Sequence, residues 1–505
     1  MSTAPASSPR PEGQRTVAAA ALLATYLQAV TISIPNAAVF HIGGAFSMQD
    51  DEIGWIFTSY IAASAVIFPM TRWLAGRFGR KTVFQTSIAI FAVGLLLATQ
   101  ASTLMQFLGA RIIQGAASGT LAPLPLAILL NDLPPHRHNH IGMASTFTVL
   151  LGILSGPAIG GWLSEYFGWQ SIFYACLAVS GLVFLAMGLS LREKKTGTNA
   201  PFDLFGLATL SLGMVALQMV LDRGERLDWF ASNEIRIEAI GSAFGFCLYA
   251  VHILTTRVHF LDKALFRDRN FVLSTVMFFA FGFVLLPTVA LTSPMLEELL
   301  GYPADTTGYM TIPRSLALLG GLALAWLMPK RVDNRLLLII GATLVTYGNW
   351  RMIGYSPLMD WWPVVAAGMF QGAGLGLLMP TLTKTAFSTL SPALRPEGTA
   401  LFNLARLYGS TIGVAIVQLY FFNNTQAMHL ALASHATSHV VAAQAPGLLS
   451  GAGLGVLNEM MTGQAAAIAL FGQFKLLMIA MLIASPLALL LRKPRPAATL
   501  PGAGK

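Results

Sequence analysis

The chain has 505 residues, of which 55% are apolar and 10% are charged, and its mean hydropathy is +0.65. Soluble domains carry roughly a quarter charged residues, so the composition excludes a soluble protein and allows about a dozen or more membrane-spanning helices of ~20 residues. The formal net charge of +9 does not indicate a nucleic-acid partner, because the basic residues follow the membrane topology described below. Cys176 and Cys247 both lie in apolar stretches, so neither a disulfide framework nor a metal site is expected.

Apolar runs separated by charged residues predict fourteen membrane-spanning helices, and therefore an all-α polytopic membrane protein. In chain order the runs lie near residues 16–39, 53–74, 83–101, 104–130, 142–164, 170–191, 203–221, 235–256, 270–293, 307–329, 336–355, 361–385, 397–422 and 470–491. The first run exceeds the ~7 to 15 residues of a signal-peptide core, so we interpret it as the first span.

The basic residues predict the orientation of these spans. If the N-terminus is cytoplasmic, most of the 31 lysines and arginines fall on the cytoplasmic side, and only Arg223, Arg226 and Arg236 fall in segments on the opposite side. Both termini are therefore expected in the cytoplasm, with tails over residues 1–15 and 492–505.

Two halves of the chain resemble each other. Residues 114–123 read QGAASGTLAP and residues 371–380 read QGAGLGLLMP, so six of ten positions agree. GPAIG at 156–160 is echoed by GSTIG at 409–413. We therefore predict six-helix bundles over 16–195 and 263–491, with two inserted helices over 196–262. Duplicated bundles around a midplane cavity are typical of secondary transporters.

The fifth predicted span contains GILSGPAIGGW, in which glycines four residues apart let helices approach closely and a proline bends the helix. This segment resembles the antiporter motif of the major facilitator superfamily, within it the fourteen-span drug:proton antiporters of the EmrB/QacA type. The resemblance implies that the motif seals the transport cavity on one side; a plain packing face is the alternative. The motif residues are Gly152, Gly156, Pro157, Gly160 and Gly161.

An arginine in the fourth span, Arg111, precedes Gln114 in RIIQGAASG. Arginine at membrane depth is costly and usually faces a cavity or a partner. The family resemblance implies a role in substrate passage or proton coupling, whereas an arginine satisfied by backbone carbonyls is the alternative. The predicted cavity residues are Asn36, Arg111, Gln114, Arg351, Gln371, Asn403 and Arg406.

The segment TRWLAGRFGRK, between the second and third spans, resembles the cytoplasmic gating loop of the family, whose Asp caps a neighbouring helix and latches the two halves. Gly76 stands at the place of that Asp, and Arg72 stands where Gly is usual. A basic loop that serves only the topology is the alternative. The residues that fit the pattern are Arg77, Gly79, Arg80 and Lys81.

The first span departs from the subfamily, which generally carries an Asp shortly before Asn36; here Thr31 occupies that place. Proton antiport is therefore implied by resemblance and not by the residues of the spans. The remaining proton-coupling candidates are Asp222, Glu165 and His41, with His252 as a further titratable group, although a lone His in a span is more often a packing residue.

The resemblance implies a multidrug-type exporter of hydrophobic or amphiphilic small molecules in the bacterial inner membrane, working by alternating access and driven by the proton gradient without a bound cofactor. Arg111, Arg314, Arg351 and Arg406 lie at membrane depth with no carboxylate near the middle of a span, which favours weak organic acids as substrates. The alternative is that all four arginines are structural, in which case they predict no charge preference. A transporter without proton coupling, or a degenerate sensor, is the alternative. The spans contain no constellation typical of a membrane enzyme.

A long polar segment, residues 423–469, separates the last two predicted spans on the outer side. It is expected to form either an amphipathic surface helix or a disordered loop. By resemblance to EmrB-type proteins, it implies a periplasmic adaptor of the EmrA kind and an outer-membrane channel as partners, in addition to membrane lipid and the transported molecules. A free-standing pump is the alternative.

Overall fold

The computed structural model describes residues 11–49, 52–133, 138–191, 193, 203–224, 227–256, 263–328, 332–356, 359–391, 394–435 and 451–492. Within these residues the regular structure is entirely helical, so the predicted all-α class is confirmed. The outer parts of both predicted tails, and the histidine-rich connection at 134–137, lie outside the described residues.

The helices of the first half follow the predicted spans closely. They are α1 (Pro11–Ser33), η1 (Ile34–Ala38), α2 (Val39–Phe46), α3 (Trp55–Ile67), η2 (Phe68–Met70), α4 (Thr71–Phe78), α5 (Arg80–Thr99), α6 (Leu104–Leu121), α7 (Leu124–Asp132), α8 (His138–Phe167) and α9 (Gln170–Ser190).

The inserted pair and the second half complete the fold. These elements are α10 (Leu204–Arg223), η4 (Trp229–Ala231), α11 (Asn233–Thr255), η5 (Lys263–Arg267), α12 (Arg269–Pro294), η6 (Met295–Leu299), α13 (Ala304–Leu327), α14 (Asn334–Ile353), α15 (Trp361–Ala386), α16 (Arg395–His435), α18 (Gly451–Ala484) and η9 (Ser485–Leu490).

Thirteen described helices are long and apolar enough to cross a membrane. The remaining predicted span is the segment Trp55–Phe78, which η2 divides into α3 and α4. Pro69 lies in η2, and because proline has no backbone N–H it interrupts the α-helical hydrogen bonds. Pro35 and Pro123 stand at similar breaks in the first and fourth spans, between α1 and α2 and between α6 and α7.

Two hydrophobic cores lie side by side in the bundle. One is built mainly from α1 to α9 and includes the buried rings of Phe84, Phe91 and Phe107, whereas the other is built mainly from α12 to α18. Each core also takes residues from the other half: Leu286 and Leu404 join the first, and Ala29, Leu150, Ile153 and Leu154 join the second. The halves therefore pack on each other through α1, α8, α12 and α16.

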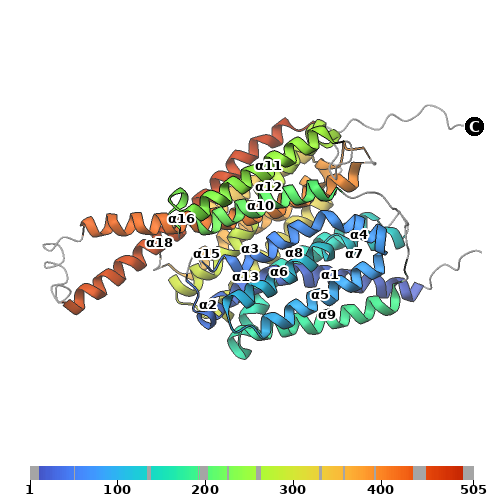
Figure 1. Ribbon diagram of the computed structural model, residues 1–505. Coiled ribbons are helices and arrows are strands. Elements are labelled where there is room, and N and C mark those ends of the chain that lie inside the picture. The colour runs from blue at the N-terminus through green and yellow to red at the C-terminus, as the bar shows by residue number, and fades with distance from the viewer. Residues whose placement is uncertain are drawn as a thin grey trace, which may run out of the picture.

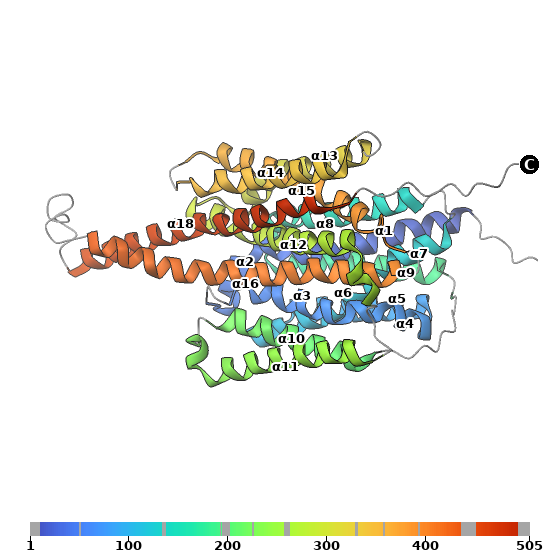
Figure 2. The same cartoon turned by 90° about the horizontal axis from the view of Figure 1, so that it is seen from above.

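The inserted helices α10 and α11 lie at one edge of the bundle (Figure 2). They pack closely because Gly213 and Gly245 face each other; a side chain at Gly245 would stand 2.8 Å from the Gly213 Cα. Helix α10 also packs against α3 and α16, so the pair contacts both halves of the protein.

Helices α16 and α18 project together beyond the rest of the bundle, at the end opposite the start of α1 (Figures 1 and 2). Helix α16 has 41 residues, about 60 Å at 1.5 Å per residue, which is twice the ~30 Å hydrocarbon thickness of a membrane. The two arms are joined where His429 Nε2 lies 3.1 Å from Asn458 Oδ1. Residues 423–435 and 451–469 are therefore helical, which contradicts the disordered-loop alternative, but they extend the last two spans instead of forming a separate surface helix. Residues 436–450 lie outside the described residues.

Candidate transport site between the two halves

The antiporter-motif glycines of α8 form a groove for the first span. A side chain at Gly152 would stand 2.7 Å from the Ala29 Cβ, and one at Gly156 would stand 2.9 Å from the backbone nitrogen of Ile34. Gly160 meets the backbone oxygen of the same Ile34. These three glycines therefore serve close packing within the first half.

The end of the motif faces the other half of the protein. A side chain at Gly161 would overlap the backbone oxygen of Ala304, the first residue of α13. Gly308, one turn further along α13, packs against Pro157 and Ala158, and a side chain there would stand 3.0 Å from the Pro157 oxygen. The two halves thus touch backbone to backbone at the end of the bundle from which the α16–α18 pair projects.

Arg111 is fully buried in α6 and its hydrogen-bonding groups are satisfied. Its Nε donates to the Ile56 oxygen at 3.1 Å, and Nη1 donates to Gln114 Oε1 at 2.9 Å. Both terminal nitrogens reach the Thr31 oxygen at 3.4 Å, and the guanidinium lies 4.5 Å from the centre of the Tyr60 ring. The alternative interpretation of a structural arginine, satisfied by carbonyls, fits this geometry.

Gln114 and Gln371, which the internal repeat equates, are both fully buried but bind different partners. Gln114 donates to the Gly94 oxygen at 2.9 Å. Gln371 donates to Thr288 of α12 at 3.1 Å and to Asn349 of α14 at 3.0 Å, and its own oxygen has no hydrogen-bond partner in the described structure.

Asn36 and Arg314 line one small cavity between the halves. Asn36 is buried in η1; its amide donates to the Val289 oxygen at 2.5 Å and to Ser293 Oγ at 3.1 Å, both on α12. Arg314, on α13, is 6% exposed. Its Nε and Nη2 atoms, and Asn36 Oδ1, have no hydrogen-bond partner within the described chain. The cavity is lined by Asn36, Ile153, Leu154, Pro157, Val289, Thr292, Thr311, Arg314 and Ser315.

The other three predicted cavity residues lie elsewhere. Asn403 is half-buried on α16 and donates to the Thr399 oxygen of its own helix at 2.9 Å. Arg406, one turn later, is half-buried, and its Nε has no partner in the described chain. Arg351 is exposed in the last turn of α14. The structure therefore brings Asn36 together with Arg314, which the sequence had indicated only as one of several embedded arginines.

The predicted gating loop makes its described contacts within the first half. Arg77 lies over the Trp73 ring, Arg80 reaches Asp132 at 4.0 Å, and Lys81 donates to the Gly188 oxygen at 2.6 Å. The carboxylate of Glu193 accepts from the backbone nitrogens of Lys81 and Thr82, at 3.3 and 3.0 Å. Glu193 therefore caps the N-terminus of α5, where the partial positive charge of the helix end favours a carboxylate.

Gly79 makes room for this cap. Its φ of +93° is in the region that favours glycine, and a side chain there would overlap the Glu193 carboxylate. Sequence reasoning missed Glu193, because it follows α9, more than a hundred residues later in the chain.

Of the proton-coupling candidates, Asp222 alone is packed at a junction of helices. Gln218 donates to Asp222 Oδ1 at 2.8 Å and to the Thr411 oxygen of α16 at 3.4 Å, and their helix α10 packs against α3 and α16. Glu165 and His41 are exposed.

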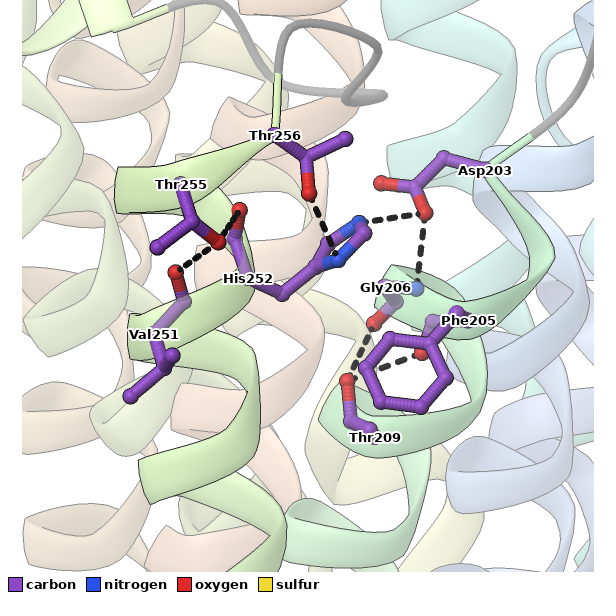
Figure 3. A network of polar contacts seen from close by, with 8 residues as sticks. All are labelled: Asp203, Phe205, Gly206, Thr209, Val251, His252, Thr255 and Thr256. Carbon is purple, nitrogen blue, oxygen red and sulfur yellow. Dashed lines mark hydrogen bonds and ion pairs between the residues drawn. The ribbon is translucent and has the colours of Figure 1, made fainter.

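His252 pairs with a residue that sequence reasoning had not considered. Its Nε2 lies 2.7 Å from Asp203 Oδ1, and its Nδ1 lies 3.2 Å from the Thr256 hydroxyl (Figure 3). The same Asp203 oxygen accepts from the Gly206 nitrogen at 2.8 Å and caps α10. This network joins α10 to α11 and is a structural device of the inserted pair.

Two larger cavities lie at opposite ends of the bundle; the lining of the first belongs to the first half, and that of the second to both halves. At the end where α1 begins, a cavity of about 430 Å³ is lined by α1, α7 and α8, through residues that include Ala18, Leu129 and His140. Towards the opposite end, a cavity of about 160 Å³ lies between the first half and α12, α16 and α18. Its lining is mostly apolar, with Gln418 and Gln473 among the few polar side chains.

A repeated six-helix bundle, with cavities at both ends and an unpaired polar site between the halves, defines a secondary transporter. Residues 20–414 match the family model described as Major Facilitator Superfamily, and the chain is a member of this family. It is a multi-pass protein of the inner membrane.

Two similar proteins indicate which transporters within this family the chain resembles. The chain is 30% identical over 421 residues to the multidrug export protein EmrB of Haemophilus influenzae, covering 82% of this chain and 81% of that protein. It is 29% identical over 453 residues to the fatty acid resistance protein FarB of Neisseria gonorrhoeae, covering 88% and 89%. These relatives confirm the resemblance to EmrB-type transporters.

Solved structures agree in fold. A bacterial homolog of the human lysosomal transporter Spinster, in an inward-facing and occupied conformation, has a TM-score of 0.67 at 15% identity and covers 95% of this chain and 97% of that one. The nucleoside transporter NupG has a TM-score of 0.61 at 13% identity, over 93% and 99%.

Proposed function

We propose that this protein is a proton-coupled efflux transporter of amphiphilic small molecules, with weak organic acids as favoured substrates. The observation that carries the proposal is the backbone contact of Gly161 and Pro157 with α13, because it places the end of the antiporter motif where the two halves meet. The names of the relatives, which include multidrug export and fatty acid resistance, support the same function. No enzymatic activity and no bound cofactor belong to this proposal.

The proposed orientation has both termini in the cytoplasm. The α16–α18 pair then lies on the outer side, the contact between the halves closes the outer end, and the 430 Å³ cavity opens toward the cytoplasm. Substrate enters this cavity, and separation of the halves at Gly161 releases it outward, as in rocking of one bundle against the other.

Transport in proteoliposomes tests this function. With an imposed pH gradient, purified protein is expected to move dodecanoate against its concentration gradient, and dissipation of the pH gradient with an ionophore is expected to stop net movement. Movement that ignores the pH gradient would overturn proton coupling, and the absence of any substrate-dependent movement would favour the degenerate sensor.

We further propose that Asp222 carries the coupling proton, because it is the candidate carboxylate packed between α10, α3 and α16. Asp222→Asn is expected to abolish pH-driven transport but to retain exchange of labelled for unlabelled substrate, which needs no net proton movement. Glu165→Gln, at an exposed carboxylate, is the matched control and is expected to retain both activities. Normal pH-driven transport by Asp222→Asn would exclude this role.

The α16–α18 pair is the proposed contact for a periplasmic adaptor, which in turn reaches an outer-membrane channel. Its arms expose several large apolar side chains: Leu430, Leu454, Val456 and Met460. Replacing all four with Ser is expected to prevent copurification of a coexpressed EmrA-type adaptor while leaving transport in proteoliposomes unchanged, because the changes lie outside the bundle. Unchanged copurification would refute the contact.

A further inference from the structure

We propose that Arg314, with Asn36 beside it, binds the carboxylate of the transported acid. This inference rests on the proposed function and assigns its substrate-binding group. The cavity between these residues is lined by η1 and α8 of the first half and by α12 and α13 of the second. A ligand bound there contacts both halves at once, as a substrate that moves with their rocking must do.

The buried positive charge of Arg314 is the first observation that supports this site. The side chain is 94% buried, from its 6% exposure, and two of its nitrogens have no hydrogen-bond partner within the described chain. An incompletely paired buried cation is strongly unfavourable; carbonyls satisfy Arg111, whereas these two nitrogens of Arg314 find no such acceptor among the described residues. The environment of Arg314 therefore favours an anionic ligand.

The identity of the free nitrogens is the second argument. Nε and Nη2 lie on one edge of the guanidinium plane, and their N–H bonds point in the same direction. Two parallel N–H donors match the two oxygens of a carboxylate, which binds such an edge in a bidentate manner. The free edge of Arg314 is thus suited to a carboxylate more than to a neutral acceptor with one oxygen.

The neighbouring polar groups are the third argument. The hydroxyls of Thr292, Thr311 and Ser315 line the same cavity and donate to backbone oxygens of their own helices, at 2.7, 2.7 and 3.0 Å. Each hydroxyl can turn toward a ligand. Asn36 Oδ1, which has no partner in the described chain, can accept a hydrogen bond from the hydroxyl of an acid that arrives in its neutral form.

Because the cavity is small, substrate binding there requires a change of conformation. Its volume is about 10 Å³, roughly the space of a single water molecule. A carboxylate therefore binds only when α8 and α13 move apart, and the motif residue Pro157 is part of the wall that moves. Substrate binding and the contact at Gly161 are coupled through the same two helices.

A set of ligands with one tail and different head groups tests the site. Binding of dodecanoate, dodecanol and dodecyltrimethylammonium to purified protein in nanodiscs is measured for the wild type and for Arg314→Gln. We expect Arg314→Gln to weaken dodecanoate binding by at least about tenfold, and to leave dodecanol binding unchanged. Arg314→Lys, which keeps the charge but loses the paired N–H donors, is expected to be intermediate. Arg236→Gln, an exposed arginine on α11, is the control.

The outcomes separate this site from the proposed function. Wild-type affinity of Arg314→Gln for dodecanoate would overturn the site, even if the wild type transports the acid. Binding that depends on Arg314, in a protein that shows no pH-driven transport, would overturn the function but keep the site. If Arg314→Gln is not recovered as a monodisperse protein, Arg314→Lys decides, because equal affinity for dodecanoate would also contradict the bidentate geometry.

Discussion

The side chain of Arg314 on α13 packs against Gly368 on α15, the residue that the internal repeat aligns with Arg111. A Cβ at Gly368 would lie 3.5 Å from the Cβ and 3.7 Å from the Cδ of Arg314. In the first half, Arg111 lies on the same helix as Gln114, the glutamine of the repeat. In the second half, Gly368 takes the place of that arginine on the helix of Gln371, and the buried arginine Arg314 comes from α13 instead. The two halves therefore hold the buried charge differently: Arg111 donates to backbone carbonyls, whereas Nε and Nη2 of Arg314 have no hydrogen-bond partner among the described residues.

Gly368 and Gly372 on α15 give a first prediction about the contact between α15 and α13. Gly368→Ala is expected to retain the fold, because 3.5 Å is an ordinary contact distance and alanine favours a helix over glycine by about 0.5–1 kcal/mol. Gly372→Ala is expected to lower the melting temperature, because its Cβ would overlap the backbone oxygen of Arg314. Thermal unfolding in detergent compares the two variants, and equal melting temperatures would contradict the packing described here.

The antiporter motif gives a second prediction, which separates packing from gating. Gly161→Leu is expected to keep the halves apart at the outer end, because the side chain would overlap the backbone oxygen of Ala304. Gly156→Leu is expected to destabilise the first half itself, since Gly156 packs on Ser33 and Ile34 of the same half.

Spin labels at exposed positions near the outer ends of α8 and α13 measure the separation of the halves. Gly161→Leu is expected to lengthen the distance while the protein stays folded, and Gly156→Leu is expected to reduce the yield of folded protein. An unchanged distance in Gly161→Leu would show that the motif does not close this end.

The hydropathy of the chain predicted most spans to within a few residues, because each apolar run ends at charged residues that remain in water. It failed for α16 and α18, which continue beyond the predicted ends at 422 and before 470. Polar residues such as Asn423, Gln426 and Asn458 interrupt the apolar runs there, although the helices continue through them. The two arms contact each other where His429 Nε2 lies 3.1 Å from Asn458 Oδ1.

The candidate site was only partly predictable, for a physical reason. Asn36 was expected in the cavity, and Arg314 was noticed only as an embedded charge. The sequence around an arginine at membrane depth does not tell whether backbone carbonyls accept its hydrogen bonds. The difference between Arg111 and Arg314 arises from helices 50 to 80 residues away, through Ile56 and Thr31, and appears only once those helices are placed.

The inserted pair gives a third prediction. Asp203 both caps α10 at Gly206 and pairs with His252. Asp203→Asn is expected to keep the cap, because Asn is also a good N-cap residue, but to lose the charged partner of His252. Asp203→Ala loses both contacts and is expected to cost about 1 kcal/mol more. Protease sensitivity of the inserted pair in nanodiscs ranks the variants; identical sensitivity of Ala and Asn would show that the cap contributes nothing.

A fourth prediction concerns Thr31, which occupies the place of the carboxylate expected in the first span. Thr31 is fully buried, its backbone oxygen accepts from Arg111, and its hydroxyl donates to the Leu27 oxygen at 2.7 Å. A carboxylate at this position lies beside a buried guanidinium, so Thr31→Asp is expected to fold, since the opposite charge offsets the desolvation of the new anion. In an Arg111→Gln background the same Asp has no cation nearby, and the double variant is expected to be lost from the membrane. Fluorescence-detected size exclusion of the single and double variants measures this coupling. If Thr31→Asp were equally stable with and without Arg111, the two side chains would not interact, which would contradict the proximity of Arg111 to Thr31.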